Sequence, residues 1–128
     1  MQSNSLTITN FTKGKLPSLP FLEMKNAAMG KNYELSLVFI GERRSKKLNT
    51  IYRNKHKSGN ILSFPLDKKT GEIFICPVRA RREAKSFDRK YENFIAFLFI
   101  HGLCHLKGMD HGSTMEKAEE KIRTQFGV

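Results

Sequence analysis

The stretch YENFIAFLFIHGLCHLKG, residues 91–108, decides the fold because it is apolar almost all the way round a helix. A helix without a polar face lies in the interior of a domain and not on its surface. Gly108 is suited to the left-handed backbone conformation that ends a helix. We therefore expect one buried helix at this place, with the other elements packed around it.

Strands and helices alternate on either side of this helix, with no internal repeat. Short apolar runs bounded by Gly, Pro or Asn are typical of strands, and apolar residues three or four positions apart are typical of amphipathic helices. This order predicts an α+β fold over residues 1–128 as a single domain, with one mixed β-sheet of about four strands packed with helices. The expected strands are residues 6–10, 33–40, 60–66 and 71–77, and the expected helices are residues 19–28, 42–53, 91–108 and 113–126.

Turn and cap signals mark several ends of these elements. Residues 67–71, DKKTG, predict a hairpin loop between two strands. Gly30 is expected to end the first helix. Ser113 and Glu116 form the pattern of a capping box at the start of the last helix.

The chain has a large excess of positive charge, +11 from 23 Lys and Arg against 12 Asp and Glu. Such an excess favours polyanionic partners such as nucleic acid, although a solvated face that keeps the protein soluble is the alternative. Because two basic clusters flank a candidate catalytic site, we favour RNA or DNA as the partner. The first cluster holds Arg43, Arg44, Lys46, Lys47, Arg53, Lys55 and Lys57, and the second holds Arg79, Arg81, Arg82, Lys85, Arg89 and Lys90.

The cysteines and the apolar runs indicate the compartment. Cys76 and Cys104 lie in apolar runs, where a reduced thiol behaves as a small hydrophobic side chain. The N-terminal sequence has no basic segment followed by an apolar region, and FIAFLFI, residues 94–100, is too short to span a bilayer. We therefore expect a cytoplasmic protein with no membrane partner.

Three of the four histidines, His101, His105 and His111, lie close together in the sequence. Residues four apart on a helix differ by about 40° in azimuth and about 6 Å in height, so the first two share one face. A turn at Gly108 would bring His111 to the same point, which completes the ligand set of a catalytic zinc with one position left for water. The alternative is that hydrogen bonds in the core, or solvent, satisfy each histidine separately.

The spacing also matches the H-x-x-x-H-x-x-G-x-x-H pattern of metzincin zinc proteases, with one decisive departure. Gly102 stands where these proteases have the glutamate that acts as general base, so a protease is disfavoured. Glycine within a helix costs about 1 kcal/mol relative to alanine, which indicates that a substrate or a closely packed backbone needs room beside His101. Cys104 is a weaker candidate ligand, and we expect its thiol to fill core space.

The sequence HGLCHLKGMDH, residues 101–111, resembles the signature H-G-x-x-H-L-x-G-x-D-H of the YbeY family of bacterial metal-dependent endoribonucleases. Residues 48–67 and GEIFICP, residues 71–77, resemble two further segments of that family, and the resemblance covers about residues 34–126. It implies that His101, His105 and His111 hold one divalent metal ion, with zinc as the first candidate.

The same resemblance implies a function and a set of partners. The expected activity is cleavage of single-stranded RNA in rRNA processing, including maturation of the 3′ end of 16S rRNA, and in ribosome quality control. The expected partners are rRNA and ribosomal particles, together with ribosomal proteins or assembly GTPases. Arg53 matches the arginine of the family's active-site cleft. Gly59, Asn60 and His56 depart from the family's usual threonine and aspartates and remove negative charge beside Arg53.

The residues around the histidines have candidate roles that follow from the chemistry of their side chains. A metal held by histidines lowers the pKa of bound water and polarises a phosphoryl oxygen, as phosphodiester cleavage requires. Arg53 offers a planar fork for a phosphate, unless it is an ordinary exposed helix arginine. Asp110 either orients a histidine or caps a helix end. Asn60 and Ser63 are candidate substrate-binding residues, and the alternative is that they are ordinary polar residues of an edge strand. The basic residues Arg43, Arg44, Lys46 and Lys47 are further candidates for binding the substrate.

Two other functions remain open. A basic ribosome-assembly factor could carry a purely structural metal, although only three good ligands are visible and structural zinc usually has four protein ligands. A metal-dependent hydrolase of another bond, such as an amide, is opposed by Gly102 and by the basic composition.

Overall fold

The computed structural model describes residues 5–53, 60–109 and 112–128, and its central feature is a four-stranded sheet. The strands follow the order β1-β2-β4-β3 across the sheet. β2 pairs in parallel with both β1 and β4, whereas β3 and β4 form an antiparallel hairpin. The prediction of one mixed sheet is therefore confirmed. The strands are β1 (Leu6–Asn10), β2 (Glu34–Phe39), β3 (Ile61–Asp67) and β4 (Thr70–Ile75).

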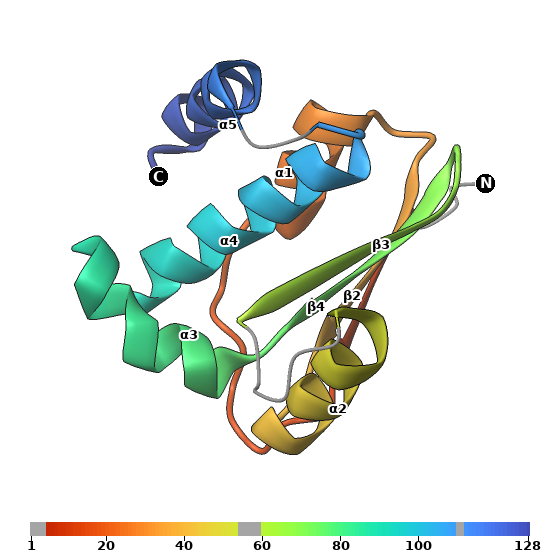
Figure 1. The fold of residues 1–128 in the computed structure, drawn as a ribbon. Coiled ribbons are helices and arrows are strands. Elements are labelled where there is room, and N and C mark those ends of the chain that lie inside the picture. The colour runs from red at the N-terminus through yellow and green to blue at the C-terminus, as the bar shows by residue number, and fades with distance from the viewer. Residues whose placement is uncertain (1–4, 54–59, 110–111) are drawn as a thin grey trace.

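Helices cover both faces of this sheet (Figure 1). α4 crosses one face over β3 and β4, with α1 and α5 packed against it, and α2 lies on the other side of the sheet. None of the helices in the described parts of the chain is long and apolar enough to span a membrane. The helices are α1 (Phe21–Met29), α2 (Glu42–Arg53), α3 (Pro77–Glu83), the 3-10 helix η1 (Ala84–Phe87), α4 (Tyr91–Leu106) and α5 (Ser113–Phe126).

The core lies between α4 and the sheet. Alternate residues of each strand point to opposite faces, so every second residue of a strand points toward α4. Leu35, Leu37 and Phe39 of β2 are buried in the same cluster as the side chains of α4. Phe94 and Phe99 of α4 are fully buried, which confirms the helix expected from the apolar stretch. The core thus fixes α4 against the strands along most of its length.

Two local predictions were wrong or incomplete. α5 begins at Ser113, but Gly112 is its N-cap and no side chain caps the helix, so the capping box of Ser113 and Glu116 does not form. Ser113 is already the first helical residue and cannot serve as the cap. Pro77, predicted as the end of a strand, instead begins α3, because proline is favoured at the first helical position. Residues 78–87, for which no element was predicted, continue α3 and form η1.

Two turn predictions are confirmed. Gly30 ends α1 with a φ of 86°, and Gly108 follows the last residues of α4 with a φ of 85°. The amide of Gly108 donates to the carbonyl of His105, and that of Met109 to the carbonyl of Cys104. These bonds satisfy carbonyls at the end of α4 and turn the chain away from the helix axis.

Candidate active site

His101 and His105 lie on successive turns near the end of α4, and their rings meet edge to face. Their Nε2 atoms are 3.1 Å apart and their ring centroids 4.6 Å apart. Two nitrogens bound to one tetrahedral zinc at its usual bond length would be about 3.3 Å apart. The two imidazoles therefore already hold nearly the separation that a shared metal ion requires.

A buried carboxylate on α5 orients the first histidine. Glu119, with 6% of its surface exposed, has its Oε2 3.0 Å from Nδ1 of His101. An ionised carboxylate only accepts, so Nδ1 of His101 donates the proton, and its Nε2 is then the acceptor that faces Nε2 of His105. Nη1 of Arg123 lies 3.5 Å from the other oxygen of Glu119. Histidines that bind metals in proteins are commonly held by a carboxylate in this way.

Glu119 was not among the residues predicted from the sequence, where the orienting role was assigned to Asp110. A signal was nevertheless present, because Glu119 lies four residues after Met115 and three before Ile122 on the apolar face of α5. An acidic residue on that face must find a partner when the helix packs.

The two histidines line a cavity of about 310 Å³ between α4 and β3. Asn60 and Ser63, two of the candidate substrate-binding residues, both lie on its wall. Nδ2 of Asn60 donates to Oε1 of Glu83 at 2.7 Å. The cavity combines imidazole nitrogens, an amide and a hydroxyl with an apolar surface. Its lining residues are Asn60, Ile61, Ser63, Phe87, Phe97, Leu98, His101 and His105.

Gly102 allows β3 to pack closely against α4. A Cβ atom at this position would lie 2.9 Å from both Oγ of Ser63 and Cδ1 of Ile61. The room beside His101 is therefore taken by the side chains of the sheet. A glutamate at position 102, as in the metzincin pattern, would collide with them.

Cys104 lies in the core and not among the candidate ligands. Its side chain is fully buried, and burial, reinforced by the negative charge of Glu119, raises the pKa of the thiol to about 11. The thiol is therefore neutral near neutral pH, whereas a metal ligand is a thiolate. Cys76 is also buried and free, so both cysteines are reduced core residues as predicted.

Three predicted site residues cannot be placed in this cavity. Arg53 is the last residue of α2 but its side chain is not described, and Asp110 and His111 lie outside the described residues. Within the described ranges, no three His, Cys, Asp or Glu side chains form a group that could hold a metal ion. The expected ligand set of three histidines thus depends on His111.

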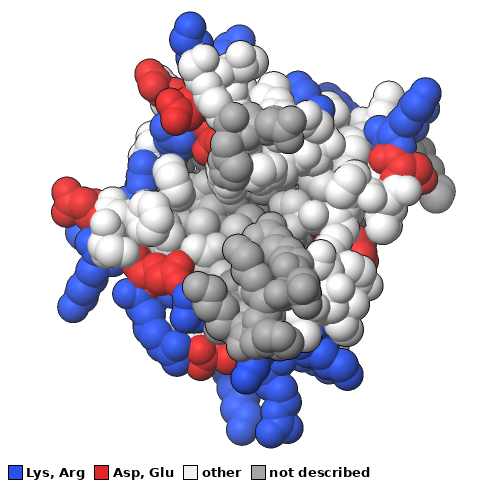
Figure 2. Space-filling model, viewed as in Figure 1, with Lys and Arg blue, Asp and Glu red and all other residues white. Residues whose placement is uncertain are grey.

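The four basic residues expected to bind substrate lie on exposed positions of α2, and none lines the histidine cavity. The guanidinium of Arg44 lies 4.3 Å over the ring of Phe11, next to the sheet face that carries Val38 and Phe74. In Figure 2, Lys and Arg side chains project from the region where Figure 1 places α2. The cluster is composed of Arg43, Arg44, Lys46 and Lys47.

An α+β fold with two histidines on a buried helix, both facing a cavity and one of them held by a carboxylate, fits the class of metal-dependent hydrolases. Comparison with known proteins narrows this class: the profile of the family described as Endoribonuclease YbeY matches residues 7–127. The chain belongs to the YbeY endoribonuclease family.

Individual relatives agree with this assignment. The Endoribonuclease YbeY of Finegoldia magna is 40% identical over 87 residues, which cover 62% of this chain and 57% of that protein. The Endoribonuclease YbeY of Phytoplasma australiense is 34% identical over 130 residues, which cover 94% of this chain and 90% of the relative. The solution structure of TM1509 from Thermotoga maritima has the same fold, with a TM-score of 0.65 at 24% identity over 95% of this chain and 89% of that one.

Proposed function

We propose that this protein is a metal-dependent endoribonuclease that cleaves single-stranded RNA in the cytoplasm. Its substrates are rRNA precursors in ribosomal particles, including the 3′ end of 16S rRNA, and it serves ribosome quality control alongside ribosomal proteins or assembly GTPases. The observation that carries the proposal is the pair of Nε2 atoms 3.1 Å apart, with Glu119 behind one of them and a cavity in front. The membership of the YbeY endoribonuclease family supports it.

The residues present fit a divalent metal, and zinc is the first candidate because imidazole is among its preferred ligands. His101, His105 and His111 would hold the ion. When bound, such a metal supplies Lewis-acid polarisation of a phosphoryl oxygen and activation of water. Glu119 fixes the tautomer of His101 through Nδ1, which keeps Nε2 unprotonated for the metal. Asp110, next to His111 in the sequence, is proposed as an additional orienting carboxylate.

We propose that residues of α2 and β3 bind the substrate. Arg53 ends α2, and the chain reaches the cavity wall at Asn60, seven positions later. The guanidinium of Arg53 would bind the scissile phosphate through two parallel N–H groups and stabilise the negative charge of the transition state. The hydroxyl of Ser63, and the Asn60 amide beyond the bond that its Nδ2 donates to Glu83, can form hydrogen bonds to the ribose or the base.

The test of this function is cleavage of a labelled single-stranded RNA, followed on a gel beside the metal content of each protein. Arg53→Glu should keep the metal but lose cleavage, because an anion then stands at the phosphate site. Arg53→Lys should keep part of the rate, because it preserves the charge and loses the fork. His105→Ala should lose both metal and cleavage.

Undiminished cleavage by Arg53→Glu would remove that arginine from the active site. Absence of cleavage by fully metallated wild type, with RNA binding retained, would favour a non-catalytic ribosome-assembly factor instead. Cleavage that survives in Arg53→Glu and in His105→Ala alike would point to a contaminating nuclease.

A further inference from the structure

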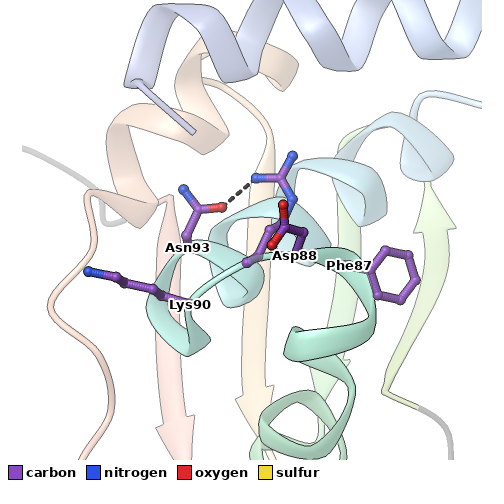
Figure 3. A pocket seen from close by; sticks show the side chains of 5 residues that line it. Phe87, Asp88, Lys90 and Asn93 are labelled. Carbon is purple, nitrogen blue, oxygen red and sulfur yellow. Dashed lines mark hydrogen bonds between the residues drawn. The ribbon is translucent and has the colours of Figure 1, made fainter.

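A second cavity adjoins the histidine cavity. It has a volume of about 490 Å³ and is lined by the last residue of η1, the turn that follows and the first turn of α4, namely Phe87, Asp88, Arg89, Lys90 and Asn93 (Figure 3). Phe87 lines both cavities. A ligand that extends from the histidine cavity into this second cavity therefore passes Phe87.

Phe87 is a supported aromatic ring with an exposed side. Its ring stacks on Phe94 with centroids 4.9 Å apart and 30° between the planes, and Phe97 lies 6.0 Å away. Half of the residue, 50%, nevertheless remains exposed. Asp88 follows in the left-handed conformation, with a φ of 54°, and turns the chain directly after the ring. The ring is thus supported by Phe94 and Phe97, while half of the residue's surface is accessible to a ligand.

Cationic side chains continue the cavity beyond this ring. The guanidinium of Arg89 lies 4.3 Å over Phe97, and its Nη1 donates to Oδ1 of Asn93. The guanidinium of Arg123 lies 5.3 Å from the same Phe97 ring, so two like charges share one aromatic surface. In Figure 3, the side chains of Phe87 and Lys90 point in opposite directions. The wall therefore runs from an aromatic ring to basic groups, with the single carboxylate of Asp88 among them.

We propose that this Phe87 cavity binds the nucleotide next to the scissile phosphate of a single-stranded RNA. The base stacks on the open side of Phe87, Arg89 contacts the adjoining phosphate, and Lys90 attracts the backbone beyond it. Aromatic platforms beside basic groups are the usual means of holding unpaired bases. Because a base in a duplex is already stacked and cannot reach the ring, Phe87 would also favour single strands. This inference rests on the proposed function.

The experiment compares Phe87→Ala, Phe87→Leu and Phe87→Tyr in binding to a short RNA that contains the fluorescent base 2-aminopurine, whose emission is quenched on stacking. Binding is measured in chelator so that cleavage does not interfere. Phe87→Ala should weaken binding by about tenfold and remove the quenching. Phe87→Leu keeps the apolar cover over Phe94 but lacks a π face, so it should also lose the quenching, whereas Phe87→Tyr should retain it.

Phe11→Ala is the control, because Phe11 is also an exposed ring, 57% exposed, and it lies outside the Phe87 cavity. Phe11 lines a different cavity beside α2, so Phe11→Ala should keep the quenching seen with wild type. Lys90→Gln should reduce the salt dependence of binding while the quenching persists, since its contact is electrostatic. Affinity for duplex RNA should be the same in wild type and in Phe87→Ala.

Equal affinity and equal quenching in wild type and Phe87→Ala would overturn the inference while leaving the proposed function intact, provided that wild type cleaves RNA. Full quenching in Phe87→Leu would also overturn it, because an apolar cover would then suffice. A wild type that neither binds nor cleaves single-stranded RNA would overturn the proposed function together with this inference.

Discussion

Glu119 and His101 form the contact on which the geometry of the candidate site depends. The carboxylate is almost fully buried, and it reaches His101 and Arg123 from a single position on α5. Burying a carboxylate is costly unless it is paired, so these two contacts offset the cost of placing it there. The orientation of one imidazole is thereby coupled to the docking of the last helix.

Replacing Glu119 by glutamine tests this coupling. Glu119→Gln keeps the shape but removes the charge that fixes the tautomer of His101, so metal affinity should fall by about 10- to 100-fold. Competition with a chromophoric chelator measures the affinity. Glu120→Gln, at the neighbouring exposed position, is the control and should bind metal like wild type. Equal affinities in all three proteins would show that the carboxylate does not serve the metal site.

A substitution at Gly102 tests how closely α4 packs against β3. Gly102→Ala should lower the free energy of unfolding by about 1–2 kcal/mol, because overpacking against β3 outweighs the gain in helix propensity. The closest atoms are Oγ of Ser63 and Cδ1 of Ile61, both at 2.9 Å. Ser63→Ala in the same chain should therefore recover part of the loss. Urea denaturation of the two single variants and the double variant gives the coupling, and an additive result would contradict the close contact.

The histidine pair could be predicted from the sequence, but its orienting carboxylate could not. His101 and His105 meet because four residues make about one helical turn, which is a local property of the chain. Glu119 reaches His101 from 18 residues away, and that contact exists only after α5 packs on α4. Spacing within one helix gives no information on such a contact.

At the scale of elements, α1 is tied to the sheet by a buried lysine. Lys25 is fully buried, and its Nζ donates to Oγ of Ser5 at 2.7 Å and to the carbonyls of Gly30 and Tyr33 at 3.0 and 2.8 Å. These acceptors belong to the turn after α1 and to the residues directly before β1 and β2. One ammonium group therefore holds three segments together.

Lys25→Met should lower the free energy of unfolding by about 2–4 kcal/mol, because the buried carbonyls lose their donor. Lys31→Met, at an exposed position nearby, should have little effect. Thermal or urea denaturation measures both variants. Equal stability of Lys25→Met and wild type would mean that packing alone joins α1 to the sheet.

The buried Lys25 also makes the free energy of unfolding depend on pH. Burial lowers the pKa of Lys25 below its ordinary value of 10.5, so between these two pKa values the unfolded chain binds more protons than the folded chain. The stability that wild type has over Lys25→Met should therefore increase as pH rises through the range just below 10.5. Urea denaturation of both proteins at about pH 8 and about pH 10.5 measures this difference. A difference that shrinks with pH would contradict the direction of the shift.

Most element positions followed from local patterns, with one instructive exception. α2 was predicted at residues 42–53, where it is found, because Gly41 and a basic amphipathic pattern mark it. α3 was missed because Pro77 follows an apolar strand and was taken as its end. Proline suits a strand end and the first turn of a helix equally, so only the packing of Ala80 and Ala84 into the core decides between them.

At the scale of the whole molecule, the sheet separates two surfaces. α4 brings the histidines to one side, whereas the basic residues of α2 lie on the other. Neither this separation nor the strand order β1-β2-β4-β3 was predictable from the sequence. Strand patterns show which residues share a face, but the choice of neighbours depends on contacts between distant segments.

The salt dependence of RNA binding tests whether the basic cluster on α2 contacts phosphates. If Arg43, Arg44, Lys46 and Lys47 contact phosphates, changing all four to glutamine should reduce the salt dependence of RNA binding, by up to about 2.8 in the slope of log K against log salt. The control changes four exposed lysines elsewhere, Lys13, Lys15, Lys31 and Lys117, which alters net charge equally. Identical slopes for the two variants would mean that α2 acts only through net charge.

The central claim is that a metal held by His101 and His105 is what enables this chain to cleave RNA. The most direct test titrates zinc into the metal-free protein while the rate of cleavage of a labelled single-stranded RNA is followed. The rate should rise in proportion to bound metal up to about one ion per chain and then stay constant, with His105→Ala remaining at the baseline throughout. Full-rate cleavage by the metal-free wild type, or a rate that does not change with metal occupancy, would contradict the claim.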